Sequence, residues 1–349
     1  MSWMIYGANG YTGALAAREA HARGMRPVLA GRNAGAVRSL AAELGLEHRV
    51  FALDEPSAVR AGLDGMRLVL HCAGPFSRTS APMVDACLAT GAHYLDITGE
   101  IDVFAAAQAR HEEAVRADLV LLPGAGFDVV PTDCTAASLA AALPAAVSLQ
   151  LAFEAGGGLS PGTAKTSLER LPRGGCVRRD GKLTDVPLAW KTRTVPFAHA
   201  ERSAATIPWG DVYTAWVSTG IPNIEVYLSM PPATIRRLRR LRYLQPLLGT
   251  SWMQSFLRRR IEARVQGPDA ERRAASGASI WGEVRSADGR AVSATMTTPN
   301  GYDLTVTASL GIVERLLGEA VEGGYYTPSL LMGADYAAGL PGVDFSLND

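Results

Sequence analysis

Glycines recur at positions 7, 10 and 13, near the beginning of the chain. They lie in the run Gly-Ala-Asn-Gly-Tyr-Thr-Gly, between a short apolar stretch, residues 3–6, and an alanine-rich segment with helical spacing. In a strand–loop–helix unit, such glycines allow a tight turn and let backbone N–H groups at the helix N-terminus approach a pyrophosphate. The spacing therefore predicts a dinucleotide-binding loop. Its expected contact residues are Gly7, Asn9, Gly10, Tyr11, Thr12 and Gly13.

A second candidate contact follows the second expected strand, residues 26–30. NAD-binding proteins normally carry Asp or Glu about 20 residues after the glycine loop, where it accepts the ribose hydroxyl groups. This chain has Gly31, Arg32 and Asn33 at that point. No carboxylate is there to repel a 2′-phosphate, and the Arg32 guanidinium can bind one through two charge-assisted hydrogen bonds. We therefore predict NADP(H) as the cofactor, with Arg32 and Asn33 at its adenosine end. The alternative is that Arg32 is one more arginine in an arginine-rich chain.

A third group of candidates follows the fourth expected strand, residues 67–72, which runs into a Gly-Pro pair. At the carboxyl edge of a parallel sheet, such a break lies where the nicotinamide ribose of a bound cofactor would pass. An ordinary strand-to-helix turn is the alternative. The residues expected to line the cofactor cleft are Ala73, Gly74, Pro75 and Phe76.

Acidic and hydroxyl side chains follow the next two strands. Asp96, Thr98 and Glu100 come at the end of strand 92–95, on the rim where substrate-facing groups lie in such sheets. Solvated loop acids are the alternative. Asp128 lies just before an expected helix, so it either caps that helix or faces the site.

The motifs lie between regularly repeating secondary-structure elements: through the first 125 residues, short apolar strands alternate with alanine-rich helices. This alternation is typical of a doubly wound parallel sheet, with a ligand across the carboxyl ends of its strands. The expected strands lie near residues 3–6, 26–30, 49–53, 67–72, 92–95 and 118–122. The expected helices lie near residues 12–23, 34–44, 56–62, 80–90, 101–116 and 131–142.

The regular alternation of strands and helices ends after about residue 145. Alternating polarity on both sides of Asp288-Gly289 predicts a β-hairpin, residues 279–285 and 292–297, and helices become rare. This pattern predicts a second, α+β domain with a mainly antiparallel sheet. Its other expected strands lie near residues 147–154, 192–198, 212–218 and 223–229, and a final helix is expected near residues 305–320.

Five motifs occur in order: GANGYTG, AGRN, CAGPF, HYLDITGE and GFDVVPTD. Together they resemble the saccharopine dehydrogenase-like oxidoreductases, including the trans-acting enoyl reductases grouped with them. The resemblance is close over about the first 135 residues and looser beyond. It implies a Rossmann domain that binds NADP, an inserted α+β domain that supplies substrate and dimer contacts, and a C-terminal helix that returns to the first domain. The domains expected on this basis are residues 1–135, 136–303 and 304–349, with the last segment packed on the Rossmann domain.

The resemblance also implies catalytic candidates. It places Thr163 and Lys165 near the nicotinamide and turns Tyr302 toward the cleft. Hydride transfer to an imine or a conjugated alkene needs a proton donor for the charge that develops, and we expect it among these three residues. Lys165 follows a glycine-rich loop, so it is either an acid, an anchor for a substrate carboxylate or a surface lysine.

The expected activity is hydride transfer to or from a C=N or activated C=C bond of a small or carrier-bound substrate by an NADP(H)-dependent oxidoreductase. Two alternatives stay open. One is an NADP-binding redox sensor without turnover. The other is a trans-acting enoyl reductase on acyl chains bound to a carrier.

Charge and cysteine content limit the partners. The formal net charge is zero, so nothing predicts nucleic-acid binding. Four cysteines without paired spacing predict no metal site and, with no signal peptide or membrane-spanning run recognised, a cytoplasmic protein. A homodimer follows from the resemblance. The arginine-rich segment 235–260 predicts amphipathic helices that contact a membrane surface, an acidic carrier or another subunit, or that form a solvated face.

Overall fold

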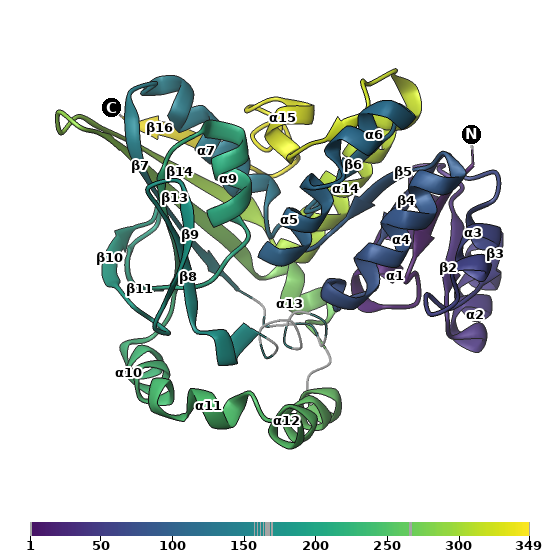
Figure 1. Ribbon diagram of the computed structural model, residues 1–349, viewed down its shortest axis with the longest axis horizontal. Coiled ribbons are helices and arrows are strands. Elements are labelled where there is room, and N and C mark those ends of the chain that lie inside the picture. The colour runs from purple at the N-terminus through teal and green to yellow at the C-terminus, as the bar shows by residue number, and fades with distance from the viewer. Residues whose placement is uncertain are drawn as a thin grey trace. The chain divides into compact units, whose positions relative to one another are not determined.

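The computed structural model describes two compact units, each with its own β-sheet (Figure 1). The first unit comprises Met1–Asp128 and Tyr302–Leu331, and the second comprises Val129–Gly301 and Met332–Asp349. The chain therefore leaves the first unit, builds most of the second and then returns. The description covers the whole chain except residues 1, 157, 159, 161, 163, 165–167, 169, 265, 266 and 349.

The first unit is built on a parallel sheet of seven strands in the order β15-β6-β5-β4-β1-β2-β3. The strand order reverses beside β1, which pairs with β2 on one side and with β4 on the other. This is the switch point of a doubly wound sheet, and it confirms the predicted fold class. The strands are β1 (Trp3–Tyr6), β2 (Val28–Gly31), β3 (His48–Val50), β4 (Leu68–His71), β5 (His93–Asp96), β6 (Val120–Leu122) and β15 (Gly324–Tyr325).

Helices pack in pairs against this sheet, α1 beside α2 and α3 beside α4. The single helix predicted over residues 101–116 is wrong, because the chain leaves the helical conformation at Arg110 (φ −97°, ψ 9°). At this break the Arg110 guanidinium binds Asp85 of α4 and Glu113 of α6. The helices are α1 (Tyr11–Ala22), α2 (Ala34–Leu44), α3 (Pro56–Leu63), α4 (Phe76–Thr90), α5 (Ile101–Gln108), α6 (His111–Ala117) and α14 (Gly301–Gly318).

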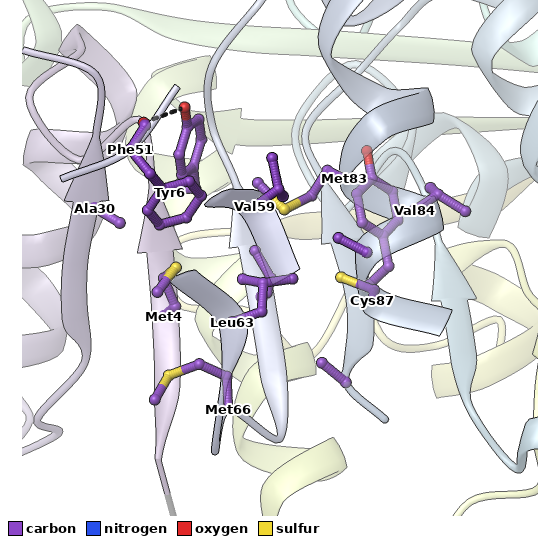
Figure 2. Packing of buried hydrophobic residues seen from close by; sticks show 14 of the residues in the cluster. Met4, Tyr6, Ala30, Phe51, Val59, Leu63, Met66, Met83, Val84 and Cys87 are labelled. Carbon is purple, nitrogen blue, oxygen red and sulfur yellow. Dashed lines mark hydrogen bonds between the residues drawn. The ribbon is translucent and has the colours of Figure 1, made fainter. Parts of the chain in front are cut away.

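The hydrophobic core under the carboxyl ends of these strands joins β1 to α3 and α4 (Figure 2). Met4 and Tyr6 of β1 belong to the same cluster as Leu63 of α3 and Met83 of α4, and all four are buried. The Tyr6 hydroxyl donates a hydrogen bond of 3.0 Å to the carbonyl oxygen of Phe51, which satisfies its polar group (Figure 2). The packed core gives the loops above it a rigid base.

The second unit contains a mainly antiparallel sheet in the order β10-β11-β12-β7-β13-β14-β16, with β8 and β9 attached through β12. Only β12 and β7 run parallel among the described pairs. The predicted hairpin is confirmed as β13 and β14, with Trp281 opposite Thr295. The strands are β7 (Ala146–Ala155), β8 (Gly175–Arg179), β9 (Lys182–Val186), β10 (Thr192–Pro196), β11 (Glu201–Thr206), β12 (Asn223–Ser229), β13 (Gly277–Ser286), β14 (Ala291–Pro299) and β16 (Asp344–Asn348).

One predicted strand is a helix. Residues 212–218 lie in α9 (Asp211–Thr219), which ends at Gly220 in the left-handed conformation (φ 71°). The segment is rich in β-branched and aromatic residues, but its buried face packs against α7 (Val130–Ala142), so tertiary contacts override local propensity.

The C-terminal part of the chain divides between the two sheets. α14 and β15 belong to the first unit, as the predicted return of the last helix requires. β16 instead pairs antiparallel with β14 in the second sheet, and Met332–Asp349 belong to the second unit. The functional domain limits proposed from the sequence remain a prediction.

Candidate functional site

The glycine loop between β1 and α1 closes so tightly that two of its glycines have no room for a side chain. Gly7 has a φ of +81°, and a Cβ there would lie 2.8 Å from the backbone nitrogen of Ala73. A Cβ on Gly13 would lie 2.3 Å from the carbonyl oxygen of Gly7. The Gly10 N–H donates a hydrogen bond of 2.9 Å to that same oxygen. These positions require glycine for both conformational and steric reasons.

The N-terminus of α1 differs from those of two neighbouring helices. Asn33 caps α2 by accepting a hydrogen bond from the Ala36 N–H (3.1 Å). The Glu100 carboxylate caps α4 by accepting from the N–H groups of Phe76 (2.9 Å) and Ser77 (2.8 Å). For α1 the cap residue is Gly10, which has no side chain with which to cap this end. The positive end of α1 therefore fits an external anion such as a pyrophosphate.

The loop Ala73–Phe76 lies directly against the glycine loop, since Ala73 occupies the space beside Gly7. The Thr79 hydroxyl holds it by donating to the carbonyl oxygens of Ala73 (2.7 Å) and Pro75 (3.1 Å). Gly74 is exposed and is joined to Pro75 by a cis peptide bond. The Phe76 ring, in contrast, is buried against His71, with 5.4 Å between ring centroids. The structure thus brings the two predicted cofactor loops together, with the Phe76 side chain in the core.

The residues at the end of β2 are of the types expected to bind a cofactor ribose that carries a 2′-phosphate. A Cβ on Gly31 would lie 3.0 Å from Asn9 Oδ1, so a larger residue at position 31 would crowd the Asn9 amide. Arg32 is exposed, whereas the Asn33 side chain is engaged as the cap of α2. Burial raises the pKa of Tyr6 to about 12, and the positive charge of Arg32 opposes this rise. That coupling shows that Arg32 lies close to the end of β1.

A buried hydrogen-bond network joins the ends of β5 and β6. The Asp96 carboxylate accepts hydrogen bonds from the Tyr94 hydroxyl (2.6 Å) and from the N–H groups of Thr98 (2.9 Å) and Gly124 (2.9 Å). Burial raises the pKa of Asp96 to about 7, although these three donors favour its charged form. Thr98 in turn accepts from the Glu100 N–H (3.0 Å). Asp96, Thr98 and Glu100 therefore hold loops in place, a role that sequence spacing alone does not distinguish from substrate binding.

Asp128 lies at the same edge of the sheet, outside the hydrogen-bond network of Asp96, and its pKa is also raised. It is half-buried, and a Cβ on Gly99 would lie 3.1 Å from its Oδ2 atom. Burial, reinforced by the negative charge of Glu100, raises the pKa of Asp128 to about 7. A carboxyl group with such a pKa can exchange a proton near neutral pH.

The first turn of α14 brings Tyr302 to the glycine loop. Its ring contacts that of Tyr11 edge to face, with 4.8 Å between centroids. The same turn is fixed by Thr305, whose hydroxyl accepts a hydrogen bond of 2.9 Å from the Phe127 N–H. Two catalytic candidates, Thr163 and Lys165, lie outside the described residues. Over the described residues, no group of three His, Cys, Asp or Glu side chains is placed to hold a metal ion.

A doubly wound sheet, a glycine loop at the N-terminus of its first helix and an exposed arginine after β2 define the class of NADP-binding domains. Among known families, residues 3–122 match the saccharopine dehydrogenase NADP binding domain. This part of the chain is similar to that domain, as its motifs predicted. The match also confirms NADP(H) as the expected cofactor.

Solved structures extend the likeness to the rest of the fold. Apo saccharopine dehydrogenase (L-Glu forming) from Saccharomyces cerevisiae covers 100% of both chains with a TM-score of 0.71 at 12% identity. Homospermidine synthase from Legionella pneumophila, solved in complex with NAD, covers 99% of this chain and 91% of its own with a TM-score of 0.63 at 10% identity. At these identities the matches establish the fold.

Sequence relatives match over the first part of the chain. A trans-acting enoyl reductase of Mycobacterium leprae is 32% identical over 139 residues, which cover 37% of this chain and 33% of the relative. A putative trans-acting enoyl reductase of Mycobacterium tuberculosis is 31% identical over 150 residues, 39% of this chain and 34% of the relative. The match thus spans about a third of the length of each relative.

Proposed function

We propose that the protein is an NADP(H)-dependent oxidoreductase that transfers a hydride to or from a C=N or activated C=C bond of a small or carrier-bound substrate. The observation that carries this proposal is the glycine loop at the N-terminus of α1. Gly7 and Gly13 have no room for a side chain, and the cap residue of α1 is Gly10, which has none. Backbone N–H groups at such a helix end, together with the exposed Arg32 after β2, suit a dinucleotide with an extra phosphate.

In this proposal the glycine loop and its neighbours bind the cofactor. The proposed contacts are Gly7, Asn9, Gly10, Tyr11, Thr12, Gly13, Arg32, Asn33, Ala73, Gly74, Pro75 and Phe76. The cofactor, when bound, supplies or accepts the hydride. Because Asn33 caps α2 and the Phe76 side chain is buried, these two residues shape the site through their backbone.

The chain itself supplies the proton. We propose Tyr302 as the donor, since its ring lies against Tyr11 of the glycine loop. Thr163 and Lys165 are retained as candidate donors or substrate anchors on the basis of the family resemblance. The tyrosine hydroxyl would meet the negative charge that develops on nitrogen, or on a conjugated carbonyl oxygen, during hydride transfer.

A carrier-bound enoyl substrate is the more specific candidate. The relatives from both mycobacteria carry the name trans-acting enoyl reductase, and they match the same NADP-binding region. This supports an activated C=C bond as the hydride acceptor and an acyl chain presented by a separate carrier. We also propose a cytoplasmic homodimer, which sedimentation of the purified protein and fractionation of cells would test.

The experiment that tests the activity is NADPH oxidation by the purified protein against imines, α-keto acids and enoyl thioesters. We expect turnover in one class and at least a tenfold loss of kcat in Tyr302→Phe, because general acid catalysis typically contributes a hundredfold or more. NADPH binding without oxidation in any class would instead favour the redox sensor. Failure to bind either NADPH or NADH would refute the oxidoreductase assignment.

A further inference from the structure

The arginine-rich segment of the second unit combines positive charge with exposed aromatic side chains. This segment, residues 232–264, is called the basic arm and contains nine arginines and one glutamate. It follows β12 and consists of α10 (Pro232–Leu241), a short 3₁₀ turn (Arg242–Leu244), α11 (Gln245–Leu248) and α12 (Ser251–Arg264). Figure 1 shows these three helices. Over the described residues, no helix is both long and apolar enough to cross a membrane.

The first helix of the basic arm is fixed to its unit by one face. Ile235 is buried in a cluster with Ala189 and Ala205. Arg242 donates hydrogen bonds to the carbonyl oxygens of Leu188 (2.5 Å) and Ala189 (2.6 Å). This attachment leaves a second face in solvent, and its exposed arginines include Arg236, Arg237 and Arg240.

The last helix of the basic arm presents aromatic residues where a soluble helix usually presents polar ones. Trp252 and Phe256 are 59% and 52% exposed, and their spacing of four residues places them on one face of α12. Gln254 holds the helix by donating a hydrogen bond of 2.7 Å to the carbonyl oxygen of Leu248. Arg259 and Arg260, one turn further on, are also exposed.

The connection between these helices continues the same surface chemistry. Tyr243 is 87% exposed and Leu244 is 50% exposed. The basic arm therefore contains four of the exposed large hydrophobic residues of the described chain, and three of them, Tyr243, Leu244 and Phe256, lie within two positions of an arginine. Isolated exposed apolar residues need no explanation, but a group of them in one basic segment indicates an interaction surface.

We propose that the basic arm binds the surface of an anionic lipid bilayer. Arginines would pair with headgroup phosphates, while Trp252, Phe256 and Tyr243 would enter the boundary between headgroups and acyl chains. An anionic bilayer offers a dense layer of phosphates for the arginines and, directly beneath it, an apolar boundary for the aromatic side chains. The combination of both kinds of residue favours the lipid surface, and the inference is independent of the proposed enzyme activity.

The test is flotation of the full-length protein with two kinds of vesicle, phosphatidylcholine alone and a mixture of phosphatidylcholine with phosphatidylglycerol. We expect binding to the anionic vesicles only, and weaker binding as salt rises. Each arginine near such a surface contributes about a fivefold factor in binding, so the triple variant Arg236→Gln, Arg237→Gln, Arg240→Gln should bind about a hundredfold more weakly.

The aromatic residues are tested separately from charge. The double variant Trp252→Ala, Phe256→Ala keeps every arginine and should bind at least about tenfold more weakly, since it removes inserted apolar area. Leu183→Ala, an exposed apolar residue of β9, and Arg60→Gln, an exposed arginine of α3, are matched controls that should bind as the unchanged protein does. Circular dichroism establishes that each variant is folded.

Three outcomes would overturn the proposal. The first is equal flotation with neutral and anionic vesicles. The second is unchanged flotation of the aromatic double variant. The third is a different occupant: sedimentation showing that Trp252 and Phe256 hold two copies together, or binding to an acidic carrier protein that requires the arginines while vesicles do not bind.

Discussion

Replacement of Arg32 by alanine tests the cofactor preference most directly. Arg32 follows β2 and is exposed, so its removal should leave the core intact. If its guanidinium makes two charge-assisted hydrogen bonds to a 2′-phosphate, the exposed setting limits their joint contribution to about 2 to 3 kcal/mol. The dissociation constant for NADPH should then rise about 30- to 150-fold. The constant for NADH, which lacks this phosphate, should stay within about twofold.

The assay is calorimetric titration of both nucleotides at one fixed ionic strength, because salt screens an exposed ion pair. Arg60→Ala on α3 is a matched control, since this arginine is also exposed in the first unit and has no proposed contact with the cofactor. An equal loss of affinity for both nucleotides would show a structural role for Arg32. An unchanged affinity for NADPH, or a wild-type preference for NADH, would refute the electrostatic reasoning.

Three further variants test the site in other ways. Gly13→Ala should abolish nucleotide binding in calorimetry, because the new Cβ would lie 2.3 Å from the Gly7 carbonyl oxygen, whereas Gly35→Ala, with its nearest contact at 3.7 Å, should bind normally. Burial without a hydrogen-bond partner among the described residues lowers the pKa of His71 to about 3. The folded state thus binds fewer protons than the unfolded state between about pH 3 and 6.5, and stability should fall as the pH drops through this window. The free energy of unfolding in urea is measured at pH 7 and at pH 4. The decrease between these pH values should be smaller in His71→Leu than in the unchanged protein, by up to about 3 kcal/mol. Equal decreases in the two proteins would contradict the lowered pKa of His71. Glu100→Gln should cost about 1 to 2 kcal/mol in the same unfolding assay at pH 7, since the charged cap of α4 becomes neutral, and an unchanged midpoint would argue against the capping role.

The parallel sheet could be predicted because each of its elements carries a local signal. The six strands of residues 1–125 are short apolar runs, and all six were placed within a few residues. β15 was missed, since Gly324-Tyr325 is too short to show any periodicity. The start of α4 at Phe76 was also missed, because it depends on a carboxylate 24 residues away, Glu100.

The second unit was less predictable for the same reason. The β13–β14 hairpin has an Asp-Gly turn and a local register, so the sequence was sufficient. α9 was taken for a strand because its residues favour β-structure, and only packing against α7 makes it helical.

Of the candidate site, the glycine loop was recognisable from spacing alone. The capping role of Glu100 and the raised pKa values of Asp96 and Asp128 were not, because both depend on burial and on contacts between loops. Tyr302 was suggested by family resemblance, and its ring contact with Tyr11 joins residues almost the whole chain apart.

The division of the first unit into two stretches of sequence has a consequence for synthesis. β1 to β6 emerge from the ribosome long before α14 and β15. The β6 edge of the sheet therefore lacks its partner strand β15 while about 170 residues of the second unit are synthesised. The hydrogen bond from the Phe127 N–H to Thr305 and the contact between the Tyr11 and Tyr302 rings form only after α14 is released. Any nucleotide affinity that depends on α14 would thus be acquired only after most of the second unit has been synthesised.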